Sequence, residues 1–164
     1  MSQLTIFKPN KNITGGAFSF NYNADKDYAF LKVAPQIAEM PDRDKEGPEK
    51  QKVFGWEDKA INVKLNTTDL SKLITVILGI VSMESLFHQT SSDNKIVELS
   101  YVPVKDASNP KDQGGFRFKV SQKVQGEDKP NGVIIGVSHA EAVQIRLFAE
   151  DAIIGIQKCQ TYKK

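Results

Sequence analysis

Aromatic and positively charged side chains lie close together along several short stretches of this sequence. The candidates, with one amide side chain among them, are Phe30, Lys32, Phe54, Trp56, Lys59, Asn62, Lys64, Arg117, Lys119 and Lys123. Aromatic rings stack on flat ligands, and ammonium or guanidinium groups neutralise anions. Unpaired nucleic acid exposes both its bases and its phosphates, so this combination of side chains suits a single strand.

Alternation along two stretches separates packing residues from candidate contacts. Phe116 and Phe118 alternate with Arg117 and Lys119, so a strand there turns the rings to the core and the cations to solvent. By the same rule the aromatic residues of 17–22 are expected to be buried. The cations of such a strand suit phosphate contact, although any exposed strand also carries charge.

Trp56 and the stretch after it are the other informative positions. Trp56 stands beside Glu57 near a predicted strand end, where stacking on a ligand and packing in the core are both open to it. Asn62 and Lys64 alternate with apolar residues, so we expect them to be exposed.

The sequence does not favour catalysis. His139 lies in a helix-capping pattern that begins at Ser138, and a Ser-His neighbour pair is no catalytic geometry. Cys159 is the only cysteine, which excludes an internal disulfide and leaves no paired thiolates for zinc. We expect no enzyme activity, cofactor, metal site or small-molecule substrate.

Composition indicates an ordinary globular chain. The 164 residues include 22 basic and 20 acidic side chains, a net charge of +2, so any basic surface must come from uneven placement. The longest apolar run, 73–81, is far too short to span a membrane. The N-terminus shows no signal or transit pattern, and we expect a cytoplasmic protein.

Periodicity predicts strands followed by a helix, twice. Strands are expected at 17–22, 28–33, 53–56, 60–66, 96–104, 114–124 and 133–137, and a charged loop at 38–52. The first helix is expected to be capped by Thr67 or Thr68 and to end near Ser82, and the second to follow Ser138. The expected fold is α+β, with two repeated antiparallel sheet modules, each followed by a long helix, and the helices packed between the sheets. Residues 1–14 are expected to be a flexible arm, 15–160 a single nucleic-acid-binding domain and 161–164 a basic tail.

This order resembles the Whirly-like family of single-stranded DNA-binding proteins and transcriptional coactivators. The resemblance extends over residues 15–157 and is carried by 28–35 (YAFLKVAP), 56–65 (WEDKAINVKL), 84–88 (ESLFH), 115–120 (GFRFKV) and the final strand and helix. It implies a tetramer whose helices form the central core, with single-stranded DNA lying across sheet edges and between protomers.

The first helix is apolar on more than one side, which independently favours an oligomer. The residues expected at the subunit contacts are Leu73, Ile77, Ile80, Val81, Phe148 and Ile153. The expected function is binding of single-stranded DNA with little sequence specificity, to protect or organise it in replication, repair, recombination or transcription. An RNA-binding or annealing protein of the same fold and a non-catalytic oligomeric scaffold are the alternatives.

Overall fold

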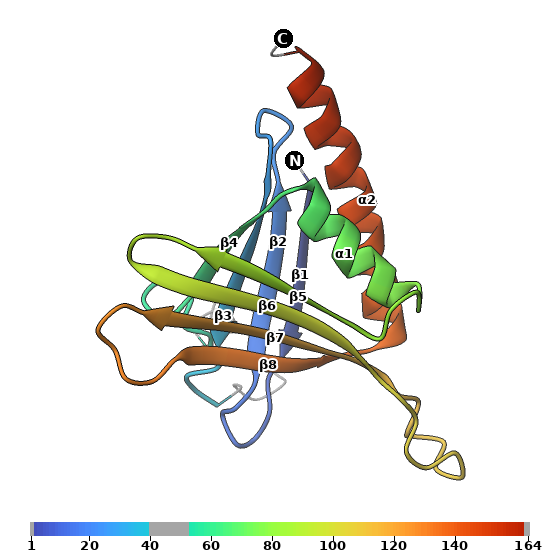
Figure 1. Ribbon diagram of the computed structural model, residues 1–164. Coiled ribbons are helices and arrows are strands. Elements are labelled where there is room, and N and C mark those ends of the chain that lie inside the picture. The colour runs from blue at the N-terminus through green and yellow to red at the C-terminus, as the bar shows by residue number, and fades with distance from the viewer. Residues whose placement is uncertain (1, 40–52, 163–164) are drawn as a thin grey trace.

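Two four-stranded antiparallel sheets form the protein, and a helix follows each sheet in the chain (Figure 1). The computed structural model describes residues 2–39 and 53–162. The first sheet contains β1 (Ser2–Lys8), β2 (Gly16–Tyr22), β3 (Ala29–Pro35) and β4 (Ile61–Leu65), and α1 (Thr67–Ile77) follows. The second sheet contains β5 (Met83–Gln89), β6 (Asp93–Val102), β7 (Gly115–Val124) and β8 (Asn131–Val137), and α2 (His139–Tyr162) follows. The predicted α+β fold with two sheet-and-helix modules is confirmed.

The N-terminal residues are part of the first sheet, so the prediction of a flexible arm over 1–14 is wrong for β1. This strand pairs with β2 in register, with Leu4 opposite Phe20 and Ile6 opposite Phe18. Ile6 is buried and Leu4 packs against the same core. Apolar burial on one face and a full antiparallel ladder fix these residues in place.

The first helix is shorter than the sequence predicts. Asn66, rather than Thr67 or Thr68, caps it: the Asn66 side chain accepts a hydrogen bond from the Asp69 N–H, and the Asp69 carboxylate accepts one from the Asn66 N–H. The helix ends at Ile77, and the positive φ of Gly79 turns the chain away. The apolar residues after it therefore lie outside the helix, and the chain enters β5, which the sequence did not predict.

The second helix begins as predicted. The Ser138 hydroxyl accepts a hydrogen bond from the Glu141 N–H at 3.3 Å, and the Glu141 carboxylate accepts one from the Ser138 N–H at 2.9 Å. The helix continues to Tyr162, so the predicted tail 161–164 starts inside it, and 163–164 lie outside the described residues. Residues 40–52, most of the predicted charged loop, also lie outside them. Within the described chain, no helix is both long and apolar enough to cross a membrane.

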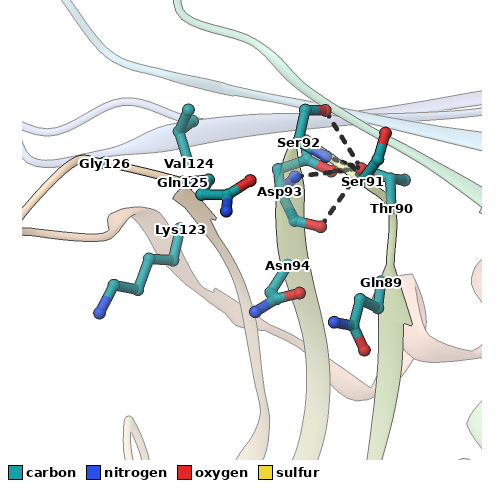
Figure 2. A pocket seen from close by; sticks show the side chains of 10 residues that line it. All are labelled: Gln89, Thr90, Ser91, Ser92, Asp93, Asn94, Lys123, Val124, Gln125 and Gly126. Atoms are coloured by element: carbon teal, nitrogen blue, oxygen red, sulfur yellow. Dashed lines mark hydrogen bonds between the residues drawn. The ribbon is translucent and has the colours of Figure 1, made fainter.

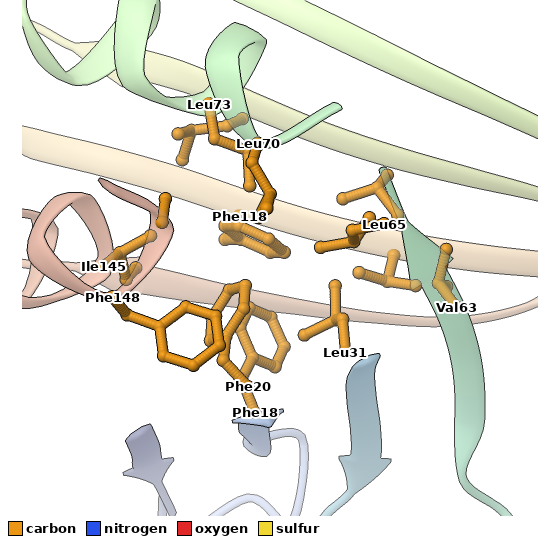
Figure 3. Close-up of a cluster of buried hydrophobic side chains, with 14 of the residues drawn as sticks. Phe18, Phe20, Leu31, Val63, Leu65, Leu70, Leu73, Phe118, Ile145 and Phe148 are labelled. Carbon is orange, nitrogen blue, oxygen red and sulfur yellow. The ribbon is translucent and has the colours of Figure 1, made fainter. Parts of the chain in front are cut away.

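The inner faces of the two sheets pack on one another, and both helices close the core (Figures 1 and 3). The Phe118 ring centroid lies 4.6 Å from that of Phe18 and 5.9 Å from that of Phe20, as the alternation pattern predicts for buried rings. A Cβ on Gly16 would lie 2.2 Å from a methyl group of Val133, so only glycine allows β2 to approach β8 this closely. Since inner positions fill the core, alternate side chains of every strand point outward.

Candidate nucleic-acid interface

The outer face of the first sheet carries polar, aromatic and cationic side chains in two aligned rows. Asn21, Phe30 and Lys64 stand side by side on β2, β3 and β4, and Ser19, Lys32 and Asn62 form the adjacent row. Neighbouring strands lie about 4.8 Å apart, so each row brings three different chemical groups within the width of a nucleotide or two. The register of the sheet, not proximity in sequence, assembles this face.

Two lysines on this face lie next to aromatic rings. The Lys64 Nζ lies 4.6 Å from the Tyr28 ring centroid, and the Tyr28 ring meets Phe30 edge-on with 4.9 Å between centroids. The Lys32 Nζ lies 5.9 Å from the Trp56 ring centroid. These cation–π contacts hold each ammonium group beside a stacking surface. Among the described residues, neither Lys32 nor Lys64 forms an ion pair, so both charges are available to an anion.

A hollow of about 420 Å³ lies on this face. Amide, hydroxyl, ring and ammonium groups line it, from Ser19, Asn21, Asn23, Lys26, Tyr28, Phe30, Lys32 and Asn62. Amides can donate and accept hydrogen bonds at base edges, rings can stack on base faces, and lysines can neutralise phosphates. The hollow therefore presents the three kinds of contact that an unpaired nucleotide needs.

Phe54 is not part of this surface, and the prediction that it contacts nucleic acid is wrong. Phe54 is only 4% exposed and packs with Ala17 and Ala34. The Phe54 ring centroid lies 6.5 Å from that of Trp56, so the two rings pack side by side. Backbone hydrogen bonds attach this segment to the end of β3, from Gly55 N to Pro35 O and from Ile37 N to Val53 O. Lys59 is exposed in the turn that follows.

The remaining predicted contacts lie on the other sheet. Arg117, Lys119 and Lys123 project from the outer face of β7, whereas Lys32 and Lys64 project from the first sheet. Since the inner faces of the two sheets pack together, these outer faces lie on opposite sides of the core. The Arg117 Nη2 is 3.6 Å from the Glu98 Oε1, which offsets part of its charge. The predicted residues therefore form two separate surfaces instead of one.

Several lining residues were absent from the set predicted from sequence. Tyr28 stands two positions before Phe30, and this spacing places both on one face of an extended segment. Ser19 and Asn21 alternate with buried rings in β2, so the same period marks them as outward-facing. The alternation in the sequence thus marks these residues as outward-facing, but the strand order that brings them together is visible only in the fold.

The residues predicted for subunit contacts divide by burial. Leu73 and Phe148 lie in the core of their own chain, and the prediction that they contact another subunit is wrong because burial leaves them almost no surface to offer. Ile77 and Ile153 are partly buried against that core, whereas Ile80 is 68% exposed. The other exposed apolar residues on and after the helices are Leu78, Val81, Val143, Leu147 and Ile154.

Two antiparallel four-stranded sheets, each followed by a helix, define a Whirly-like fold. Among solved structures, WHY3 from Arabidopsis thaliana is 16% identical, with 98% of this chain and 93% of that chain covered and a TM-score of 0.64. The plant transcriptional regulator PBF-2 is 15% identical, with 99% and 87% covered and a TM-score of 0.63. A guide-RNA-binding protein complex bound to a guide RNA is 14% identical, with 93% and 89% covered and a TM-score of 0.56. Neither the protein-family models nor the curated protein sequences give a match.

Proposed function

We propose that this protein binds single-stranded nucleic acid, foremost DNA, on the outer face of its first sheet, with little sequence specificity and without catalysis. The observation that carries the proposal is the pairing of unneutralised lysines with rings, Lys64 beside Tyr28 and Lys32 beside Trp56. Each base that stacks on such a ring contributes about 1–3 kcal/mol, and each neutralised phosphate adds a salt-dependent term.

The same surface selects against duplex. Paired bases are stacked inside the helix and cannot reach Tyr28, Phe30 or Trp56, so a duplex offers only its phosphates to the two lysines. A rigid sheet also holds the rings in place before binding, which reduces the entropy lost when a strand is ordered. Such a surface suits the protection or organisation of DNA in replication, repair, recombination or transcription.

The similar structures support this proposal and supply its alternative. WHY3 and the transcriptional regulator PBF-2 share the Whirly-like fold, and the family resemblance in the sequence implies single-stranded DNA as the ligand. The similarity to a guide-RNA complex favours RNA binding or annealing as the second candidate. Rings and ammonium groups accept either polymer, since bases and phosphates are common to both.

We further propose a homo-oligomer, most simply the tetramer that the resemblance implies. Val143, Leu147 and Ile154 leave more than half of their surface exposed along α2, and Ile80 is exposed after α1. Burying one such side chain contributes about 1.5–3 kcal/mol, so a second protomer that covers these side chains would stabilise the oligomer. This contact leaves the outer face of the first sheet free.

Fluorescence anisotropy with labelled oligomers tests the proposal, beside light scattering for mass. Oligo-dT, oligo-U and a duplex of equal length are titrated at low salt. We expect the single strands to bind, the duplex to bind far more weakly, and the scattering mass to be a multiple of the monomer. Tighter binding of oligo-U would favour the RNA alternative. An oligomer that binds no nucleic acid at low salt would overturn the proposal in favour of a protein scaffold.

A further inference from the structure

The outer face of the first sheet has a third row of side chains that the contacts proposed above do not use. Phe7 on β1 stands opposite Ala17 on β2, and Ala17 stands opposite Ala34 on β3. All three point to the same side of the sheet as Lys32, because outward positions alternate along each strand. Both alanines are buried and pack with Phe54, whereas Phe7, at the free edge of the sheet, is 46% exposed. This row therefore leaves one ring open to solvent.

Phe7 and Trp56 both pack against the buried Phe54 ring. The Phe54 ring centroid lies 5.5 Å from that of Phe7 and 6.5 Å from that of Trp56, so the two outer rings lie at most about 12 Å apart. Stacked bases repeat about every 3.4 Å along a strand and unstacked bases lie farther apart, so a few nucleotides cover this distance. A strand with one base on Trp56 therefore has a second ring within reach.

Phe7 is held in position by its neighbours. Ile6, on one side of it in β1, is buried in the core, and Lys8, on the other side, forms an ion pair with Glu141 of α2 at 2.7 Å. The Phe54 ring packs against Phe7 itself. A ring that is fixed before binding loses little conformational entropy when a base stacks on it, and such a ring accepts any base.

The second sheet has no comparable group of rings on its outer side. Its hollow, of about 440 Å³ at the tip of the β5–β6 hairpin, is lined mostly by amide, hydroxyl and charged side chains (Figure 2). Among the described residues that line this hollow, none is aromatic. Phe87 on β5 is 61% exposed, but no aromatic pair within the described chain includes it. Phe87 is therefore an exposed ring without an aromatic neighbour, and it provides a matched control for Phe7.

We propose that Phe7 is a further base-stacking residue and that the bound strand crosses the first sheet from β4 to β1. The strand lies beside Lys64 and Tyr28 at the β4 side, passes Lys32 and Trp56, and leaves the sheet over Phe7 at its free edge. The inference rests on the proposed function. It adds the path of the strand and a contact outside the hollow on that face, which Phe7 does not line.

The first test measures affinity by anisotropy at low salt, with a labelled oligo-dT of about 16 nucleotides, the upper end of the length that one small binding domain covers. The full-length wild type is compared with Phe7→Leu and with the control Phe87→Leu. Leucine still packs against Phe54 but offers no ring to a base. We expect Phe7→Leu to weaken binding at least about fivefold, the lower end of what one stacked base contributes. Phe87→Leu should bind as tightly as the wild type.

A second test reports on position 7 directly. The double variant Phe7→Trp, Trp56→Phe carries its only tryptophan at position 7, so tryptophan emission then comes from the edge strand β1. Saturating oligo-dT should quench or shift this emission, because a base that stacks on the indole changes its surroundings.

Each other result has a definite meaning. If the wild type binds but the emission from position 7 stays unchanged at saturation, the stacking role of Phe7 is overturned and the proposed function stands. Wild-type affinity in Phe7→Leu, or an equal loss in Phe87→Leu, overturns it in the same way. Absence of wild-type binding overturns the proposed function and the role of Phe7 with it. Thermal unfolding checks the fold of each variant, and if Phe7→Leu is unstable the emission measurement decides.

Discussion

Replacement of Lys32 and Lys64 by glutamine should change how binding depends on salt. Both ammonium groups lie beside rings on the outer face of the first sheet and form no ion pair among the described residues. Each phosphate of a single strand that the protein neutralises contributes about 0.7 to the slope of log K against log salt. Loss of two contacts should therefore lower the slope by about 1.4. Between 50 and 200 mM salt, the affinity advantage of the wild type should shrink about sevenfold.

Anisotropy titrations of oligo-dT at four salt concentrations measure this slope. The matched control replaces Lys111 and Lys158 by glutamine, both exposed and away from the proposed face, and its slope should stay close to that of the wild type. Glutamine keeps most of the side-chain length, so a change reports the charge. An unaltered slope in the Lys32, Lys64 variant, or an equal decrease in the control, would refute the assignment of phosphate contacts to this face.

Three further predictions concern stability. Gln36→Ala should lower the free energy of unfolding, measured in urea, by about 2–4 kcal/mol. The buried Gln36 amide makes four hydrogen bonds, two to Asn10 and one each to Gly15 and Ala38. A loss below about 0.5 kcal/mol would contradict this role. Tyr22→Phe should leave stability unchanged or raise it by about 1 kcal/mol, because the buried hydroxyl has no hydrogen-bond partner among the described residues; a clear loss in thermal unfolding argues against it. Burial opposes ionisation of Glu141, but its contacts with Lys8 and Ser138 outweigh this and lower its pKa. Its contribution to stability is therefore complete above the unfolded-state pKa and is lost as pH falls through the lower folded-state pKa. From pH 7 to pH 3 the wild type should lose more stability than Glu141→Gln, and parallel curves would show that the carboxylate contributes nothing.

Alternation and capping were sufficient to predict much of the fold. Phe18 and Phe20 in β2, and Phe116 and Phe118 in β7, alternate with polar residues and are buried as expected. The capping box at Ser138 marks the start of α2 correctly. These features are local, so the sequence displays them directly.

Long-range pairing and chain reversal were harder to predict. Residues of β1 look like a polar arm until β2 is placed beside them. The apolar run beyond Ile77 continues the helical pattern, and only the reversal at Gly79 shows that the helix has ended.

The candidate site shows the same limit. Phe54 and Trp56 lie two positions apart, yet one is buried and the other partly exposed, because Phe54 covers the small residues Ala17 and Ala34 of distant strands. Leu73 and Phe148 fit an oligomer contact by composition, but both are buried in the core that the two sheets and the two helices form. Which apolar residue meets its own chain and which is left for a partner depends on the packing of the two sheets, which no local pattern encodes.

Intrinsic fluorescence gives the most direct test of the proposed binding face. Trp56 is the only tryptophan in the chain, so tryptophan emission reports on this face alone. Oligo-dT added at low salt should quench and shift that emission to saturation, at the same concentration that saturates the anisotropy signal, and duplex DNA should leave it nearly unchanged. Oligo-dT binding seen by anisotropy with no change in Trp56 emission would contradict base contact on the first sheet.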